Sequence, residues 1–485
     1  MFFVTSHQRF PRSRPTQQAV SAKGLLRFLD RIARERIELH SLMLVRHGHV
    51  VAEGWWNPYR PDLSHRLFSL SKSFTSTAVG FAWAEGRLRV DDPVLSFFPE
   101  EDSPVARENM RGIEVRHLLM MGTGHVEDTS PKLRELGGDN WVHGFFQCPV
   151  QREPGTHFVY NNGATYMLSA IVQRVTGQTL LDYLTPRLFR PLGIDHPTWE
   201  SCPRGINRGY SGLKVTTEDI AAFGQLYLDH GRWRGEQLIP EAWVAEATKV
   251  QLANGTDPNS DWAQGYGYQF WRSRHGAYRG DGAYGQFCFV MPDQDAVLAL
   301  TSGMSDMRPI FDVVWDELLP ALATSPLSES PADLMVLEDR LQGLTLDDVP
   351  ESLATSAVPR VQTPRRIITE STSGQEVAVT VEFATPDVMR LAVVGQDWKW
   401  SIDCGLVEFL DGQSTPMLWD DGPSEPVLAR AIWVNPTTLE VVLRFYETPF
   451  CQHVRLSFDG RKAPIQFWTN TSPGNVRELR GRWAD

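Results

Sequence analysis

Apolar residues recur at helical spacing in five stretches of the first two thirds of the chain. In each stretch they return every three or four residues, which is typical of a helix with one buried face. Three of the stretches are followed directly by glycine, the residue that most often ends a helix. The helices predicted in this way cover residues 16–40, 69–85, 164–176, 217–230 and 309–322.

Strands are predicted on both sides of the helical region. Residues 42–45 and 50–51 are apolar and flank His47-Gly48, which is typical of a hairpin turn. Later strands, rich in aromatic or β-branched residues, are predicted at 266–271, 278–282, 286–291 and 296–301. We therefore expect an α+β fold. One antiparallel sheet, flanked by helices, would be assembled from both ends of this region, with a helical block inserted between them.

The hydrophobic pattern changes after residue 323. Residues 324–331 are rich in Ser and Pro, which indicates a linker. Beyond about residue 360 the apolar period becomes two, as at 377–381 and 439–443, which predicts antiparallel strands. The predicted domains are an N-terminal extension at 1–24, the α+β domain at 25–323, a linker at 324–360 and an all-β barrel or sandwich at 361–485.

Composition narrows the class of protein. Lys and Arg number 47 against 59 Asp and Glu, a net charge of −12 without a long basic run, so neither nucleic acid nor an anionic membrane is expected as the main partner. No apolar run reaches the ~18 residues of a membrane span, and the first residues lack the apolar core of a signal peptide. The five cysteines never form CxxC, so we expect reduced thiols in a cytoplasmic protein, with no metal or other cofactor.

Candidate chemistry begins with Ser69-Leu70-Ser71-Lys72 at the start of the second predicted helix. Residues three apart lie on the same helical face, so the Lys72 amine can reach the Ser69 hydroxyl. A serine hydroxyl becomes a strong nucleophile when a base removes its proton. The same spacing at 211–214 lies in a glycine-containing loop and offers no shared face. A helix cap and a surface lysine remain the alternative for Ser69 and Lys72.

A second candidate segment is Tyr160-Asn161-Asn162, the only Y-x-N among the eleven tyrosines. A phenol has an ordinary pKa near ~10 and needs a pKa ~2–3 units lower to act as a base at neutral pH. A nearby Lys72 ammonium would lower it by stabilising the phenolate. The amide of Asn162 would orient Lys72 or a substrate carbonyl. The alternative for Tyr160 is a core aromatic residue whose hydroxyl is hydrogen-bonded.

The third candidate segment is Arg279-Gly280-Asp281-Gly282-Ala283, in a glycine-rich predicted strand. Glycines within a strand often mark the close approach of a ligand to the backbone. The Ala283 N–H, paired with the Ser69 N–H, could then bind an oxyanion. Arg279 and Asp281 share one strand face, where they could select a charged substrate or form a surface ion pair. A glycine-rich hairpin turn remains the alternative for the whole segment.

Together and in this order, the three segments resemble the serine β-lactamase and penicillin-binding protein superfamily. The resemblance is to its class C-type branch of esterases, D-aminopeptidases and 6-aminohexanoate-dimer hydrolases, and it covers about residues 25–322. Supporting matches lie at 68–75, 90–94, 115–120, 154–155 and 191–194. It implies a β-lactamase/transpeptidase-like fold. It also implies Ser69 as the acylated nucleophile, Lys72 and Tyr160 as the acid/base pair, and Asn162 as a polar helper.

The third motif departs from the pattern of that superfamily. Its first position is usually Lys or His, followed by Thr or Ser and then Gly, whereas this chain has Gly280-Asp281-Gly282. The missing cation would normally meet a substrate carboxylate or support the base, so the resemblance favours small ester or amide substrates over β-lactams. We expect residues 279–283 to line the substrate site, together with Asn162.

The predicted function is therefore a cytoplasmic serine hydrolase. Tyr160, deprotonated beside Lys72, would take the proton of Ser69. The oxyanion of the substrate would rest on the N–H groups of Ser69 and Ala283. The alternatives are a penicillin-binding or non-turnover relative, a D-aminopeptidase or β-lactamase proper, and a C-terminal interaction or lipid-binding module on an inactive scaffold. The substrate's identity and the oligomeric state are not set by these patterns.

Overall fold

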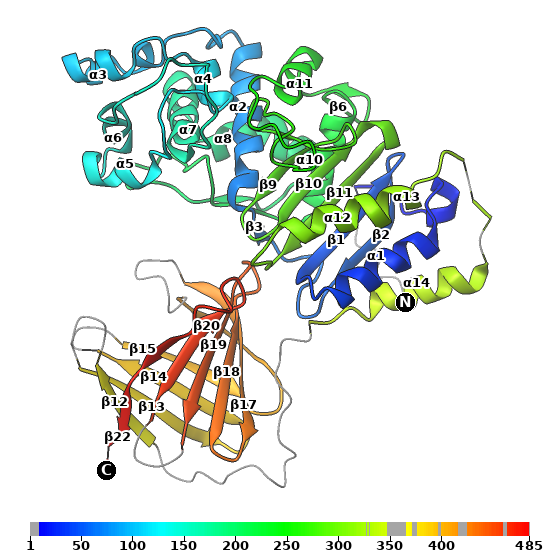
Figure 1. The fold of residues 1–485 in the computed structure, drawn as a ribbon, viewed down its shortest axis with the longest axis vertical. Coiled ribbons are helices and arrows are strands. Elements are labelled where there is room, and N and C mark those ends of the chain that lie inside the picture. Colours follow the sequence, from blue (N-terminus) through cyan, green and yellow to red (C-terminus); the bar gives the residue numbers. More distant parts are fainter. Residues whose placement is uncertain are drawn as a thin grey trace. The chain divides into compact units, whose positions relative to one another are not determined.

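A computed structural model describes residues 9–325, 327–328, 330–346, 365–370, 376–395, 399–415, 424–458 and 463–484. The chain divides into two compact units. The first comprises Met1–Trp55, Arg60–Ser302 and Met307–Leu344, and the second comprises Trp56–Tyr59, Gly303–Asp306 and Thr345–Asp485. Figure 1 traces the first unit from blue to yellow-green and the second from yellow to red.

The first unit is built on a six-stranded antiparallel sheet with strand order β2-β1-β11-β10-β9-β8. Its strands are β1 (Leu39–Arg46), β2 (His49–Trp55), β8 (Trp271–Arg272), β9 (Tyr278–Gly282), β10 (Gln286–Met291) and β11 (Ala296–Ser302). β1 pairs with β11 from Arg46↔Ala296 to Leu39↔Ser302, so the two ends of the unit's sequence meet in the middle of the sheet. This arrangement confirms the predicted α+β fold.

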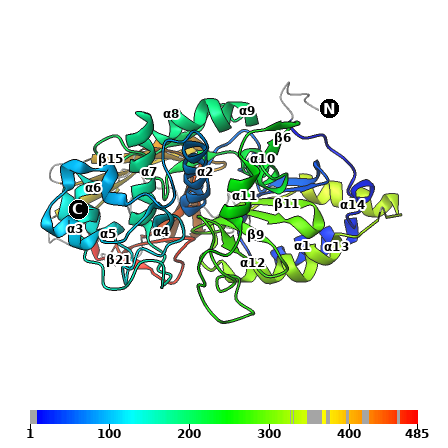
Figure 2. The same ribbon diagram turned by 90° about the horizontal axis from the view of Figure 1, so that it is seen from above.

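Helices cover both faces of this sheet. Viewed from above, α10 (Thr217–Leu228) lies on one side, while α1 (Ala22–Arg34) and α12 (Arg308–Val313) lie on the other (Figure 2). α10 packs directly on β1, β10 and β11. The helix predicted at 309–322 is divided into α12, a π-helical turn (Val314–Leu318) and α13 (Leu319–Ala321).

Between β2 and β9 the chain forms the helical block, defined here as residues 71–192. At its centre α2 (Ser71–Ala84) packs against α7 (Asn162–Thr176), α8 (Leu180–Leu184) and β9. Residues 71–82 of α2 are all buried, and polar side chains such as Thr75, whose hydroxyl donates to the Gly209 carbonyl at 2.8 Å, form hydrogen bonds inside the protein. The other helices of the block are α3 (Pro104–Asn109), α4 (Val115–Leu119), α5 (Ser130–Gly137), α6 (Trp141–Phe146) and α9 (Arg190–Leu192), and α11 (Glu241–Thr248) follows later.

A small sheet holds the segment that precedes α2. It has the order β3-β5-β4, formed by β3 (His65–Arg66), β4 (Thr198–Trp199) and β5 (Leu213–Val215), and a separate hairpin joins β6 (Arg232–Trp233) to β7 (Glu236–Gln237). Beyond β3, the Leu67 N–H donates to the Leu213 carbonyl at 2.9 Å. The residues just before Ser69 are thus fixed to a strand from a distant part of the sequence.

Gln269 connects the helical block to the sheet. It is 2% exposed, and its backbone carbonyl accepts from the Ser73 hydroxyl at 2.8 Å. Its side-chain oxygen accepts from the Thr165 hydroxyl at 2.7 Å, and its amide donates to the Leu118 and Leu119 carbonyls at 3.1 and 2.8 Å. One buried side chain therefore satisfies polar groups on α4 and α7, while its backbone does so for α2.

Two predicted elements are shorter in the structure. The helix predicted at 16–40 is a 3-10 turn (Pro15–Gln18) followed by α1, because Arg36 has a φ of +53° and β1 begins at Leu39. The strand predicted at 266–271 is regular only at β8, because Gln269 has a φ of +66°. In both places a left-handed residue, which hydrophobic periodicity does not reveal, interrupts the element.

The predicted linker at 324–360 contains a helix, α14 (Pro331–Gln342), which belongs to the first unit. The Ser330 hydroxyl caps it by accepting from the Ala332 N–H at 3.2 Å. α14 packs against α1 and β2, where Gly54 leaves space for the Leu344 side chain. Residues 347–360 of the predicted linker lie outside the described residues.

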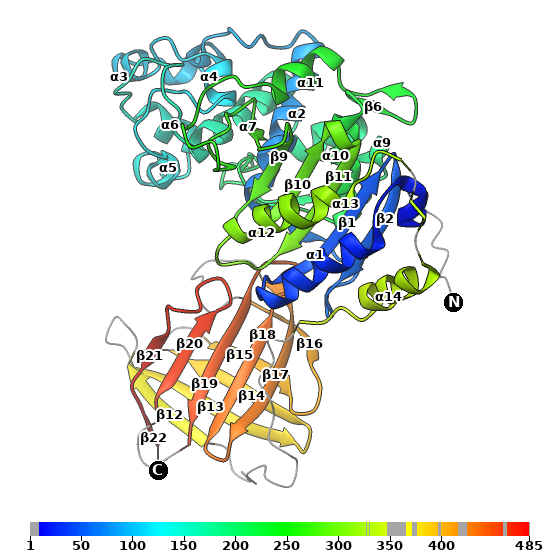
Figure 3. The same ribbon diagram turned by 45° about the vertical axis from the view of Figure 1, so that its right-hand side comes forward.

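The second unit contains an eleven-stranded, almost wholly antiparallel sheet. The path runs β21-β20-β19-β18-β17-β15-β14-β13-β12-β22, with β16 paired to β17; among the described residues of this sheet, the only parallel contact is between β15 and β17. Figure 3 shows β17–β20 facing β12–β14, so the sheet curls around its own core. In β17 the buried residues Val427, Ala429 and Ala431 alternate with half-buried ones, as a period of two predicts.

The bounds of these strands are β12 (Arg365–Glu370), β13 (Glu376–Thr385), β14 (Val388–Val394), β15 (Lys399–Gly405), β16 (Leu410–Ser414), β17 (Glu425–Asn435), β18 (Thr438–Arg444), β19 (Cys451–Ser457), β20 (Ile465–Thr469), β21 (Arg477–Leu479) and β22 (Gly481–Trp483). All five cysteines, each in the described part of the chain, are buried thiols outside any disulfide bond. Within the described ranges, every helix is too short or too polar to cross a membrane.

Candidate active site

Ser69 lies in a 3-10 turn (Phe68–Leu70) that leads directly into α2. Its side chain is partly exposed, whereas Leu70 and the helix that follows are buried. Phe68, just before it, has a φ of +49°. A left-handed conformation is costly for a bulky residue and is found mainly where the surrounding structure and function require it. The turn therefore presents the Ser69 hydroxyl at the start of a buried helix.

Lys72 lies one turn further along α2 and is 1% exposed. Its Nζ is 2.9 Å from Ser69 Oγ, 2.6 Å from Asn162 Oδ1 and 3.1 Å from the Tyr210 carbonyl oxygen. Burial lowers the pKa of Lys72 to about 7, although the carboxylates of Asp128 and Asp281 raise it in part. The structure thus brings Ser69, Lys72 and Asn162 together, with an amine that is readily neutral at physiological pH.

Tyr160 joins the same cluster. The Lys72 Nζ is 4.7 Å from the centroid of the Tyr160 ring, which stacks on Trp271 with centroids 5.4 Å apart. Burial raises the pKa of the Tyr160 phenol well above its ordinary value and the Asp281 charge raises it further, whereas a hydrogen bond with Ser69 lowers it in part. Burial therefore opposes the phenolate that we expected beside the Lys72 ammonium.

Asn162 is the first residue of α7, which Asn161 caps through its side chain. Its backbone N–H donates to Asp128 Oδ1 at 2.8 Å, and its side-chain amide donates to Asp128 Oδ2 at 2.7 Å. Two further groups of the cluster, Asp128 and the Tyr210 carbonyl, were not predicted from the sequence. The position of Asp128 just before Ser130-Pro131 is typical of a residue that precedes a helix. No local pattern in the sequence indicates that its hydrogen-bond partner is Asn162, 34 residues away.

The glycines of β9 allow this strand to lie against the nucleophile segment. A Cβ at Gly282 would lie 2.0 Å from the Leu67 carbonyl oxygen. A Cβ at Gly280 would lie 2.3 Å from Leu70 Cδ1 and 2.7 Å from Ser73 Oγ. Position 280 therefore has no room for the Lys or His side chain that is usual at this position in the superfamily. Its glycine instead allows β9 to pack closely against the nucleophile segment.

Arg279 and Asp281 form a buried ion pair, so the alternative of a surface pair is wrong. They are 0% and 7% exposed, and Arg279 Nη2 is 2.9 Å from Asp281 Oδ2. The Arg279 guanidinium also donates to Ser273 Oγ at 2.6 Å and to the Asp261 carbonyl at 2.9 Å. The positive charge of Arg279 is thus balanced by Asp281 and shielded from solvent. The negative charge of Asp281 still raises the pKa values of Lys72 and Tyr160.

Ala283 begins the turn that joins β9 to β10. The side-chain amide of Gln286 donates to the Ala283 carbonyl at 3.1 Å and to the Ser302 carbonyl at 2.9 Å, which fixes the turn to the sheet. Tyr284 has a φ of +67°, and its ring meets that of Phe68 edge to face at 5.3 Å. The turn that carries the Ala283 N–H is therefore in contact with the residue that precedes Ser69.

Aromatic side chains form one wall of the cluster. Trp271 packs edge to face against Phe158, with centroids 5.7 Å apart, and against Tyr266 at 4.9 Å. Tyr160 lies on the same wall. An apolar wall lowers the local dielectric constant, which strengthens electrostatic interactions and accounts for the displaced pKa values of Lys72 and Tyr160.

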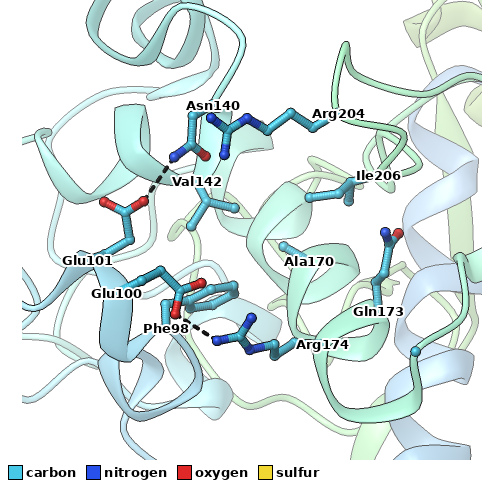
Figure 4. A pocket seen from close by; sticks show the side chains of 11 residues that line it. Phe98, Glu100, Glu101, Asn140, Val142, Ala170, Gln173, Arg174, Arg204 and Ile206 are labelled. Carbon is cyan, nitrogen blue, oxygen red and sulfur yellow. Dashed lines mark hydrogen bonds and ion pairs between the residues drawn. The ribbon is translucent and has the colours of Figure 1, made fainter.

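A surface cavity of about 430 Å³ is lined by residues of the helical block together with Arg204 and Ile206 (Figure 4). Its apolar floor includes Val142 and Ala170, and Glu101 on its wall accepts from the Asn140 amide at 2.9 Å. None of the predicted site residues lines it.

Comparisons with known proteins show the family of the chain. The model of the family described as Beta-lactamase matches residues 29–312. The 6-aminohexanoate-dimer hydrolase of Paenarthrobacter ureafaciens is 27% identical over 293 residues, which are 55% of this chain and 73% of that protein. Penicillin-binding protein 4 of Amycolatopsis lactamdurans is 27% identical over 299 residues, 53% of this chain and 76% of its own.

A solved structure shares the fold at lower identity. The putative 6-aminohexanoate-dimer hydrolase from Bacillus anthracis superposes with a TM-score of 0.54 and 21% identity, covering 66% of this chain and 89% of the other.

Proposed function

The chain belongs to the beta-lactamase family, and from this premise we propose that it is a serine hydrolase which cleaves small ester or amide substrates through an acyl-enzyme on Ser69. The observation that carries the proposal is the approach of Lys72 Nζ to within 2.9 Å of Ser69 Oγ. The burial that brings the pKa of Lys72 to about 7 makes this amine a base suited to neutral pH.

In the acylation step, the neutral Lys72 amine accepts the Ser69 proton as Ser69 Oγ bonds to the substrate carbonyl carbon. The resulting ammonium keeps two acceptors, Asn162 Oδ1 and the Tyr210 carbonyl. Tyr160, a phenol hydrogen-bonded to Ser69, donates its proton to the leaving oxygen or nitrogen and recovers one from Lys72. In the deacylation step, a water molecule gives a proton to the neutral Lys72 amine as its oxygen bonds to the acyl carbonyl carbon. Tyr160 returns a proton to Ser69 Oγ, which leaves, so that a carboxylic acid and the free serine are formed.

The backbone N–H groups of Ser69 and Ala283 stabilise, by hydrogen bonds, the negative charge that develops on the substrate carbonyl oxygen. Removal of one such donor typically costs about 3 kcal/mol of transition-state stabilisation. The pairing of β9 with β10 and the contact between Phe68 and Tyr284 hold the two donor segments together. These constraints support a preorganised oxyanion hole.

The third motif supports a neutral substrate. Gly280 has no side chain and Arg279 is paired with Asp281, so neither can meet a substrate carboxylate. The aromatic wall formed by Phe158, Trp271 and Tyr160 favours an apolar acyl or leaving group. We therefore expect turnover of p-nitrophenyl esters and little turnover of nitrocefin, whose carboxylate would lack a partner.

Replacement of the nucleophile tests the proposal. Ser69→Ala should lower kcat/KM for p-nitrophenyl butyrate by about 10³-fold or more, because the covalent step is lost. Ser96→Ala is the matched control, because Ser96 is exposed and its hydroxyl donates to the Pro93 carbonyl. Unchanged turnover in a folded Ser69→Ala protein would overturn the proposal.

A second candidate is an acylated protein that does not turn over, which the similarity to a penicillin-binding protein favours. Intact-mass measurement after mixing with p-nitrophenyl butyrate separates the two candidates. A hydrolase returns to its original mass as ester is consumed, whereas a non-turnover protein keeps one acyl group and releases one equivalent of nitrophenol.

A further inference from the structure

Both carboxylate oxygens of Asp128 are occupied by hydrogen-bond donors. Oδ1 accepts from the Asn162 N–H at 2.8 Å and the Ser130 N–H at 3.0 Å. Oδ2 accepts from the Asn162 side-chain amide and the Ser130 hydroxyl, each at 2.7 Å. Four donors on one half-buried carboxylate fix its position and direction.

The charge of this carboxylate decides which way the Asn162 amide faces. A carboxylate can only accept hydrogen bonds, so it binds the NH₂ end of the amide and turns the oxygen toward Lys72. The Asn162 Oδ1 is accordingly 2.6 Å from Lys72 Nζ. The reverse orientation would set the amide oxygen against a carboxylate and NH₂ against the N–H bonds of Lys72.

The orientation of Asn162 in turn directs the lone pair of Lys72. A neutral amine has two N–H bonds and one lone pair in a tetrahedral arrangement. Asn162 Oδ1 and the Tyr210 carbonyl accept the two N–H bonds at 2.6 and 3.1 Å. The lone pair is left for the third neighbour, the Ser69 hydroxyl at 2.9 Å. This is the geometry that proton transfer from Ser69 requires.

We propose that Asp128 is a positioning residue of the hydrolase, which acts through Asn162 to aim the Lys72 amine at Ser69. The inference rests on the function proposed above and adds to it a residue that the three recognised segments do not include. Asp128 sits just before α5, a helix that supplies none of those segments, so it joins this part of the helical block to the reaction.

Asp128→Asn keeps the shape of the side chain and removes its charge. Misdirection of the amide should lower kcat for p-nitrophenyl butyrate by about 10²-fold with little change in KM. Because the Asp128 charge raises the pKa of Lys72, the acid limb of the kcat/KM profile should also move to lower pH. A loss of folded protein alone would lower activity and leave that limb in place. Asp182→Asn, at an exposed carboxylate near the start of α8, is the matched control.

A double-variant cycle tests whether Asp128 acts through Asn162. In an Asn162→Ala background there is no amide to orient, so adding Asp128→Asn should change kcat by less than about twofold on the plateau above pH 8, where Lys72 is already neutral. A further tenfold or larger loss in that background would overturn the proposal. So would an unchanged kcat and an unmoved acid limb in Asp128→Asn itself.

A milder variant serves if Asp128→Asn does not fold, as judged by circular dichroism. Ser130→Ala removes one of the four hydrogen bonds on Asp128 and should lower kcat by less than Asp128→Asn. An unchanged kcat would then count against the proposal. If Ser69→Ala retains its esterase activity, the proposed function itself is refuted. If Ser69→Ala loses this activity while Asp128→Asn keeps it in full, only the role of Asp128 is refuted.

Discussion

The pH dependence of turnover distinguishes an amine base from a phenolate base at this site. With a pKa of about 7 for Lys72, the neutral fraction of the amine is about 1% at pH 5, 9% at pH 6, 50% at pH 7 and 91% at pH 8. The neutral amine is the active form, so kcat/KM should fall about tenfold per pH unit below the pKa. It should be nearly level above pH 8.

The profile is measured on the full chain with p-nitrophenyl butyrate between pH 5 and pH 10, read at the isosbestic wavelength of nitrophenol. Because burial raises the pKa of Tyr160 far above this range, the phenol stays protonated throughout and adds no rising limb. Tyr160→Phe should therefore lower the plateau by about 10²-fold, through loss of the general acid, and keep the acid limb near pH 7.

Lys72→Arg is the variant that isolates the base. A guanidinium is never neutral in this range, so the variant should lose turnover at every pH while it keeps a positive charge at the site. A wild-type profile that keeps rising through pH 9 and 10 would refute the reasoning, because it would identify the phenolate as the base. A Lys72→Arg protein that keeps the wild-type profile would refute it equally.

Three further substitutions test the scaffold around the site. Gln269→Leu should lower the free energy of unfolding in urea by at least about 2 kcal/mol, because it leaves buried hydroxyl and carbonyl groups without partners. Arg279→Met should cost about 3–5 kcal/mol in the same assay, because it leaves Asp281 buried without its ion partner. Gly282→Ala should lower ester turnover about tenfold or more, because the new Cβ would displace the Leu67 carbonyl and with it the nucleophile segment.

Gly412→Ala is the control for the glycine substitution, because a Cβ there meets no atom within 4 Å. An unfolding free energy within about 0.5 kcal/mol of the wild type, the range of ordinary surface changes, would contradict the prediction for the Gln269 or the Arg279 variant. Equal ester turnover in Gly282→Ala and Gly412→Ala would contradict the prediction for Gly282.

Much of the first unit follows from short-range patterns in the sequence. The short apolar runs at 42–45 and 296–301 predict strands, and their position at both ends of the region predicts a shared antiparallel sheet, which the β1–β11 pairing confirms. Ser69 and Lys72 are three residues apart on one helical turn, so their contact is set by helix geometry alone. Breaks such as Arg36 and Gln269 escape this kind of prediction, because a single left-handed residue leaves the hydrophobic pattern intact.

The sequence by itself therefore determined the kinds of chemical group at the site: a hydroxyl, an amine, a phenol and an amide in recognisable local spacings. Only the tertiary structure decided their protonation and direction. Desolvation makes Lys72 rather than Tyr160 the group that titrates near neutral pH. A carboxylate 34 residues from Asn162 turns its amide, and packing against α2 excludes a cation at Gly280. The physical reason is that pKa values and hydrogen-bond directions depend on burial and on charges brought close in space, and spacing along the chain contains neither.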